Sequence, residues 1–194
     1  MHRPASPSIS ITLDLDHPDD ATYGQQALSF YTPHYGDYCY LPLRGFEAHT
    51  GALVSAVLRP GRRPAGAENA MIMKRVPGWL RSYWPQPHIV LRGDGHFSNP
   101  QLMELIIADG NADFTFGLGG NAILTRHAKG LMRNARGHLA LRRSLAAQGL
   151  GPAVAAVRLF GAFEYAAKSW PQAHRVVLKA EVLAGSDGKS DKDN

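Results

Sequence analysis

Three aspartates, Asp14, Asp16 and Asp94, occur where a predicted strand carries or ends on a carboxylate. The segment ISITLDLD (9–16) alternates apolar and polar residues, which predicts a strand with Asp14 and Asp16 on one side. The segment HIVLRGD (88–94) is almost wholly apolar before it ends on Arg92, Gly93 and Asp94. A carboxylate at the end of a buried strand either caps a turn or helix, or it takes part in catalysis or metal binding.

Pairing two of these carboxylates predicts metal chemistry. Two ionised carboxylates ~4 Å apart repel each other by about 4 kcal/mol at an effective dielectric constant of 20. A divalent cation between them removes this cost, and Mg²⁺ binds one or two protein carboxylates together with water and substrate phosphate. The hypothesis is a Mg²⁺ or Mn²⁺ site for phosphoryl transfer. Its ligands are Asp16 and Asp94, and Asp14 is the alternative to Asp16, which stands nearer the end of its strand.

The elements that must position these residues follow from hydrophobic periodicity and turn residues. Strands are expected over 9–16, 38–48, 52–60, 88–94, 113–119 and 174–183, and helices over 67–84, 99–110 and 121–148. Pro42 places its strand at an edge or at a bulge, and Pro77 with Gly78 should kink or split the first helix. The order predicts an α/β fold, a mixed sheet in β-β-β-α-β-α-β order with helices on its faces. A right-handed crossover then sets 88–93 parallel to 9–16, so that Asp16 and Asp94 meet at one edge.

Composition and charge limit the class of protein. The 194 residues include one cysteine, Cys39, which excludes a disulfide within the chain and a cysteine-based zinc site. No apolar run approaches the ~18 residues of a membrane span, and the N-terminal residues do not resemble a signal peptide, so we expect a soluble, cytoplasmic protein. The first 50 residues carry a net charge of −4 within a total of +5, so the remainder is strongly basic. This asymmetry suggests a polyanionic partner.

Basic residues recur along the predicted helix 121–148, at Arg126, Lys129, Arg133 and Arg136. They could contact DNA phosphates, or they could form a solvated helix face, and the spacing alone does not separate the two. His96 has two similar readings, as a metal ligand or as a turn histidine that packs against Phe97.

Five segments together resemble the DDE-type transposases of bacterial insertion sequences, in the subgroup called transposase DDE domain group 1. They are DLDHPDDATYGQQALSFYTPHYGDYCYLPL, LRPGRRPAGAENA, HIVLRGDGHFSNPQLM, DFTFGLGGNAIL and FEYAAKSWPQAHRVVLKAEV. The resemblance extends over about residues 9–183. It implies a ribonuclease H-like fold and Mg²⁺-dependent (or Mn²⁺-dependent) cleavage and joining of DNA strands. It also implies that Asp16 (less well Asp14) and Asp94 are the first two catalytic acids, and that Arg92 steadies a carboxylate or a DNA phosphate.

The chain departs from the family pattern at the third acid, which relatives carry as a glutamate on a later helix. Glu164 and Glu181 lie in strand-like segments, and neither is assigned to that role. We expect residues 1–8 and 184–194 to be disordered. Residues 9–183 would then form a partial catalytic domain, incomplete at its C-terminus, with a helical insertion at about 121–160.

Such a truncated central fragment should be inactive alone. Its expected partners are insertion-sequence ends and target DNA, a second copy of the chain, or a full-length transposase. A non-catalytic fragment that binds DNA or a transposase is the alternative, and a general metal-dependent nuclease is a third.

Overall fold

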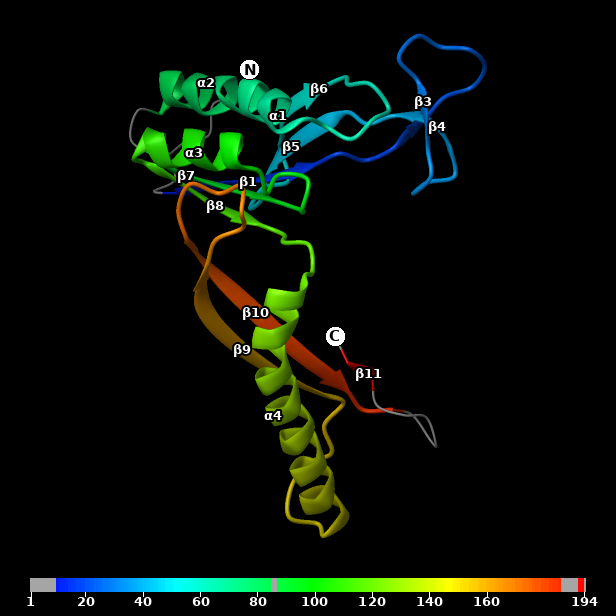
Figure 1. Ribbon diagram of the computed structural model, residues 1–194, viewed down its shortest axis with the longest axis vertical. Coiled ribbons are helices and arrows are strands. Elements are labelled where there is room, and N and C mark those ends of the chain that lie inside the picture. The colour runs from blue at the N-terminus through cyan, green and yellow to red at the C-terminus, as the bar shows by residue number, and fades with distance from the viewer. Residues whose placement is uncertain (1–9, 85–86, 186–191, 194) are drawn as a thin grey trace. The chain divides into compact units, whose positions relative to one another are not determined.

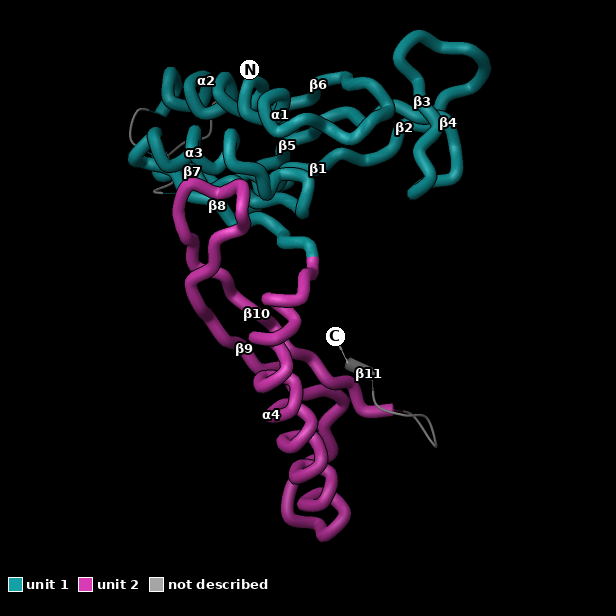
Figure 2. Tube along the Cα trace, viewed as in Figure 1, with its two compact units in different colours: residues 1–119 teal, residues 120–194 magenta. Residues whose placement is uncertain are grey.

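The computed structural model describes residues 10–84, 87–185 and 192–193, and Figure 1 shows their helices and strands. The chain forms two compact units that divide between Gly119 and Gly120, coloured teal and magenta in Figure 2. Each unit contains its own group of packed apolar residues. Among the described residues, none of the helices combines the length and the apolar character that a membrane span requires.

A five-stranded mixed sheet forms the centre of the first unit, as the sequence predicts. Its strands are β1 (Ser10–Asp16), β5 (Leu43–Glu47), β6 (Leu53–Val57), β7 (His88–Gly93) and β8 (Ala112–Phe116), in the order β6-β5-β1-β7-β8. Strands β1, β7 and β8 are parallel, and β5 and β6 form an antiparallel hairpin beside β1. The expected parallel pairing of the segments 9–16 and 88–93 is therefore confirmed.

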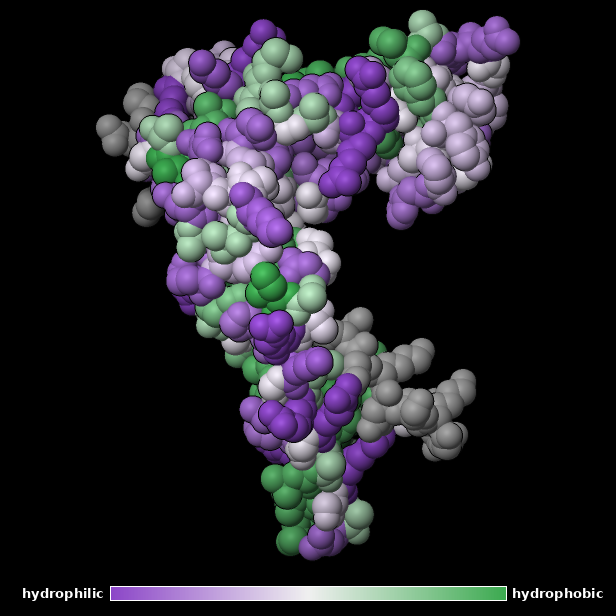
Figure 3. Space-filling view, viewed as in Figure 1, coloured by the Kyte–Doolittle hydropathy of each residue, from purple (hydrophilic) through white to green (hydrophobic). Residues whose placement is uncertain are grey.

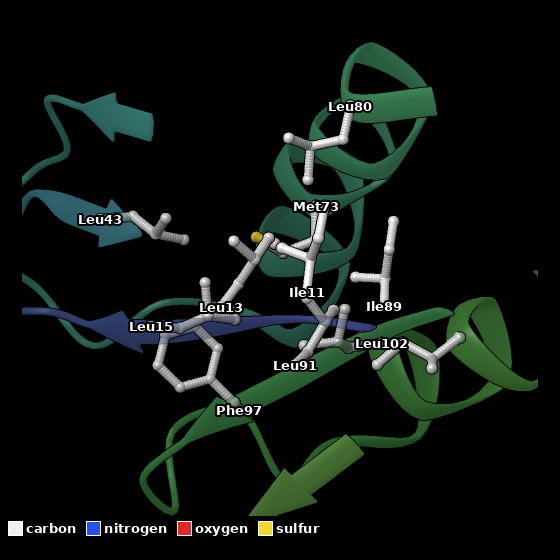
Figure 4. Packing of buried hydrophobic residues seen from close by; sticks show 11 residues of the cluster. Ile11, Leu13, Leu15, Leu43, Met73, Leu80, Ile89, Leu91, Phe97 and Leu102 are labelled. Carbon is white, nitrogen blue, oxygen red and sulfur yellow. The ribbon is translucent and has the colours of Figure 1, made fainter. Parts of the chain in front are cut away.

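The core of this unit lies between the sheet and its helices. Alternation along β1 turns Ile11, Leu13 and Leu15 to the same side, where they are almost completely buried (Figure 4). The helices α1 (Gly66–Met73), α2 (Arg75–Tyr83) and α3 (Pro100–Asp109) contribute to this cluster with Met73, Leu80, Leu102 and Ile106. The helices that build this core pack on one face of the sheet. Asp14 and Asp16 project from the other face.

Proline and glycine limit the helices of the first unit at two places, Pro77 in α2 and Gly110 after α3. The helix expected over 67–84 breaks at Lys74 and not at Pro77. Pro77 therefore lies in the first turn of α2, where its missing N–H costs no hydrogen bond. In α3 the predicted caps are confirmed: the Asn99 side chain accepts a hydrogen bond from Leu102 N, and Gly110 ends the helix in a left-handed conformation.

The strand expected over 38–48 is two strands in different sheets. Strand β4 (Asp37–Tyr40) lies between β2 (Asp20–Ala21) and β3 (Phe30–Thr32) in a small sheet, whereas β5 belongs to the large one. The chain changes sheets at Leu41 and Pro42, and proline cannot donate a backbone hydrogen bond to continue a strand. Because β5 is an inner strand of the large sheet, the edge alternative is wrong there, whereas the register of β5 with β6 shifts between Gly45 and Phe46, in agreement with the alternative of a bulge.

The second unit consists of one long helix and a three-stranded antiparallel sheet. Helix α4 (Ala122–Ala147) packs against β9 (Ala156–Tyr165) and β10 (His174–Leu183), and β11 (Lys192–Asp193) pairs with β10. The predicted helix over 121–148 and strand over 174–183 are confirmed. Residues 1–8, expected to be disordered, lie outside the described residues, as do 186–191 and 194 of the expected C-terminal tail.

Candidate functional site

Asp16 and Asp94 lie at the same edge of the five-stranded sheet. Asp16 is the last residue of β1, and Asp94 directly follows β7. The two strands run parallel with Leu15 paired to Gly93, so each aspartate is the next residue beyond a paired position. Neighbouring strands of a sheet are about 4.8 Å apart, so the two backbones are adjacent where the carboxylates begin. The register thus brings the two acids together from positions 78 residues apart.

Each carboxylate uses one oxygen to hold its own turn. Asp16 Oδ1 accepts a hydrogen bond of 2.8 Å from the His17 backbone N–H, and Asp94 Oδ1 accepts one of 2.9 Å from His96 N–H. Both aspartates are exposed to solvent. The turn-forming role of Asp94 is therefore real, and it leaves the second carboxylate oxygen, which lies 3.5 Å from His96 Nδ1, at an open surface.

Asp14 has a different environment from Asp16. It pairs in register with Arg92 on β7, and the guanidinium donates to both carboxylate oxygens over 2.5 and 2.6 Å. This bidentate contact with Asp14 raises the pKa of Arg92. Both oxygens of Asp14 are thus engaged by a cation, whereas neither oxygen of Asp16 accepts a hydrogen bond from a side chain within the described residues.

The turn after β7 depends on a small residue at Gly93. A Cβ atom there would lie 2.5 Å from Cδ2 of Phe97, whose ring is completely buried. Gly117 N–H also donates to the Gly93 carbonyl over 2.9 Å, which ties the turn to the end of β8. His96 lies in the turn after β7, as one of its two readings expects, and the ring that stacks on Phe97 is that of His17, with centroids 4.6 Å apart. His96 contacts His17 edge-on at 6.0 Å.

The structure adds residues around the acid pair that sequence spacing did not select. His17 is 3% exposed, and burial, followed by the charge of Arg59, lowers its pKa from 6.5 to about 4. Arg44 of β5 lies directly opposite Asp16 of β1 in the register of these two antiparallel strands. The pKa of Tyr35, in the turn between β3 and β4, is raised by burial and by the charges of Asp19, Asp16 and Asp94. Arg44 and Tyr35 lie far from the DLD and RGD segments in sequence, and His17 follows DLD without a motif of its own. No local sequence signal therefore identifies these three residues as neighbours of the acids.

The predicted DNA contacts other than Arg92 lie on α4 in the second unit. Arg126, Lys129, Arg133 and Arg136 are all exposed and recur at spacings of three and four, which places them along one side of the helix. Ala135 and Leu139 are buried against Ala180 and Val182 of β10. The helix contains no aspartate or glutamate. In the space-filling view hydrophilic residues gather over its middle and apolar ones over its C-terminal end (Figure 3).

The donor set at the edge of the large sheet suits a hard cation, but it consists of two carboxylates. Within the described ranges no group of three or more His, Cys, Asp or Glu side chains is arranged to hold a metal ion. Glu164 and Glu181 lie on β9 and β10, in agreement with their strand-like sequence context. Glu181 pairs with Lys179 and Arg158, and these bonds lower its pKa.

Comparisons with known proteins identify the type of domain. A family model described as "Transposase DDE domain group 1" matches residues 2–188. Among solved structures the chain is similar to the piggyBac transposase in a synaptic complex with hairpin DNA, with 13% identity and a TM-score of 0.46. That similarity covers 90% of this chain and 33% of the piggyBac chain, so this chain spans about a third of the length of that protein. No curated protein matches the sequence significantly.

Proposed function

The chain belongs to the transposase DDE domain group 1 family, and from this premise we propose that Asp16 and Asp94 are two of its catalytic acids in DNA transposition. The observation that carries the proposal is their position at adjacent ends of the parallel strands β1 and β7. We propose as well that the sheet order β6-β5-β1-β7-β8 is that of a ribonuclease H-like fold. Open sheets with parallel strands commonly bind ligands at the carboxyl ends of those strands, where both acids lie.

The carboxylates of Asp16 and Asp94 would hold Mg²⁺ or Mn²⁺, because these ions prefer oxygen ligands and accept one or two protein carboxylates. Such ions supply Lewis-acid stabilisation of the charge that develops on a phosphate when a phosphodiester bond is cleaved or joined. The protein contributes the positions of the acids: the bonds from His17 N–H and His96 N–H orient the two carboxylates. Asp14 is neutralised by Arg92, which limits the excess negative charge that a DNA phosphate meets here.

The reaction would be attack of water, and then of a DNA 3′-hydroxyl, on phosphodiester bonds, without a covalent protein intermediate. We expect this chain alone to cleave little or no DNA, because two carboxylates hold divalent cations weakly. A non-catalytic role, in which the chain binds DNA, a second copy or a full-length transposase, is therefore the second candidate. The basic, acid-free helix α4 favours this role.

We propose that Arg126, Lys129, Arg133 and Arg136 contact DNA phosphates. Their spacing presents four cations in one row, and lysine and arginine in such rows supply most of the non-specific affinity of DNA-binding proteins. Arg92 has two of its five N–H donors bound to Asp14, so the others remain available for a phosphate at the edge of the sheet.

An assay on DNA that carries insertion-sequence ends separates the candidates. The purified chain is incubated with Mg²⁺ or Mn²⁺ beside Asp94→Asn and the matched control Asp113→Asn, which removes an exposed carboxylate on the neighbouring strand β8. We expect binding of the DNA with little or no nicking. Nicking that is lost only in Asp94→Asn would establish an active enzyme. Degradation that ignores the end sequences would identify a general nuclease, and absence of DNA binding would contradict both main candidates.

A further inference from the structure

The turns that carry the two acids both approach one buried side chain, Asn69 of α1. We propose that Asn69 is a positioning residue that fixes Asp16 and Asp94 relative to each other by joining His17 to the backbone of His96. This inference rests on the proposed function of the two aspartates as metal ligands, and it assigns a role to a residue that contacts neither of them directly.

Asn69 is held in place by the first turn of its helix. The preceding residue, Glu68, accepts hydrogen bonds from Nε and Nη2 of Arg59 over 2.9 and 2.7 Å, and Arg59 is itself buried and also donates to the Leu41 carbonyl. Glu68 therefore anchors α1 on one side while Asn69, which is 0% exposed, points into the interior.

One half of the proposed connection is a hydrogen bond. Asn69 Nδ2 donates to the His96 carbonyl over 3.2 Å. His96 N–H in turn donates to Asp94 Oδ1, so the Asn69 amide holds the turn that begins at Asp94. Phe97, the next residue, stacks on the His17 ring with centroids 4.6 Å apart.

The other half follows from unpaired polar atoms. Asn69 Oδ1 and both ring nitrogens of His17 are buried, and none of these three atoms has a hydrogen-bond partner within the described residues. Both side chains contact His96: the Asn69 amide bonds its carbonyl, and the His17 ring meets its ring edge-on with centroids 6.0 Å apart, so Asn69 and His17 lie in the same buried region. Burial also lowers the pKa of His17, which favours the neutral imidazole. A neutral imidazole has one N–H donor, and Asn69 Oδ1 is a free acceptor. Because buried polar groups are nearly always hydrogen-bonded, we assign a bond between them, direct or through one water.

A continuous series of contacts then links the acids: Asp16 to the His17 N–H, the His17 ring to Asn69, Asn69 to the His96 carbonyl, and His96 N–H to Asp94. A cation shared by two carboxylates needs both at a set separation. Loss of the Asn69 amide should therefore weaken metal binding while the fold survives.

The test compares Asn69→Leu with Asn111→Leu in the full chain. Asn111 is a matched control because its side chain also joins two segments, through Pro87 O and His88 Nδ1, but at the opposite end of β7.

Mn²⁺ affinity is measured by the electron paramagnetic resonance of free Mn²⁺, and the His17 ring by long-range ¹H–¹⁵N NMR. We expect Asn69→Leu to lower Mn²⁺ affinity at least tenfold and to remove the single, protected imidazole N–H of His17. Asn111→Leu should change neither.

Unchanged Mn²⁺ affinity in a folded Asn69→Leu protein would overturn the proposal. If Asn69→Leu does not fold, His17→Phe replaces it: phenylalanine keeps the stack on Phe97 and removes both ring nitrogens, and the same loss of affinity is expected. If the wild-type chain binds no Mn²⁺, the proposed metal site fails, and the His17 N–H signal alone decides whether the Asn69 connection exists.

Discussion

Asp14 and Arg92 lie side by side on the parallel strands β1 and β7, and the guanidinium of Arg92 binds both carboxylate oxygens of Asp14. The pair lies one strand period before the ends that carry Asp16 and Asp94. This ion pair makes the environments of Asp14 and Asp16 different, although both lie on one side of β1. Asp14 is neutralised within the sheet, and Asp16 is exposed at its edge. The difference leads to a prediction for each carboxylate.

Asp16→Asn and Asp94→Asn should each lower Mn²⁺ affinity at least tenfold, because each removes one of two charged oxygen ligands. Asp14→Asn should change the affinity by no more than about twofold, since Arg92 already occupies that carboxylate and its charge is screened by solvent. The measurement is a Mn²⁺ titration at fixed salt, with Asp113→Asn as the control. A large loss in Asp14→Asn would move the first ligand from Asp16 to Asp14.

Gly93→Ala should destabilise the first unit by about 1–3 kcal/mol, the usual effect of overpacking a closed site. The added methyl group would lie 2.5 Å from the completely buried ring of Phe97, which stacks on His17. Gly95→Ala is the control, because its nearest neighbour would be 3.8 Å away. Urea unfolding of both variants gives the comparison, and equal stability of the two would show that Phe97 can shift without cost.

The stability of the metal-free chain should fall as the pH is lowered from about 6.5 to about 4. The pKa of His17 is lowered from 6.5 to about 4 in the folded state by burial, so the unfolded state binds a proton over this range and the folded state does not. The contribution is complete above pH 6.5 and amounts to about 3 kcal/mol if the full shift is realised. His17→Phe should flatten this part of the profile, whereas replacement of the exposed His138 by Gln should leave it unchanged.

The profile is measured by urea unfolding in the presence of a chelator. Trp79 and Trp84 report on the first unit, and Trp170→Phe removes the tryptophan of the second. An unchanged slope in His17→Phe would mean that other groups account for the acid sensitivity.

Replacing Arg126, Lys129, Arg133 and Arg136 by Gln should weaken DNA binding and make it less sensitive to salt. Each phosphate contact contributes about 0.9 to the slope of log affinity against log salt, so a loss of up to about 3.6 is expected if all four make contacts. Glutamine preserves helix propensity, so α4 should remain folded. The control changes Arg62, Arg63, Lys74 and Arg75 of the first unit to Gln, which removes the same charge. Equal effects of the two sets would attribute binding to net charge and not to α4.

Local pattern was sufficient for β1, α3 and α4. Alternation over 9–16 determined which side of β1 is buried, the Asn99, Pro100 and Gly110 signals determined both ends of α3, and the spacing of apolar residues determined the buried side of α4. These features depend on residues within one or two turns of each other. The parallel pairing of β1 with β7 followed from a general rule of chain handedness, and it was enough to predict that Asp16 and Asp94 share an edge.

The tertiary structure decided what depends on contacts between distant segments. Asp14 and Asp16 share one side of a strand of period two, and the sequence favours Asp16 only by its place nearer the strand end. The register that sets Arg92 beside Asp14 is what gives the two carboxylates different environments. The exchange of sheets at Pro42 and the helix break at Lys74 likewise depend on how the chain packs as a whole. His17 and Asn69 carry no sequence signal, because a buried polar residue is recognised only when the groups that bury it are known. The sequence alone therefore determined that two acids meet, and the packed structure determined which two are open and what holds them.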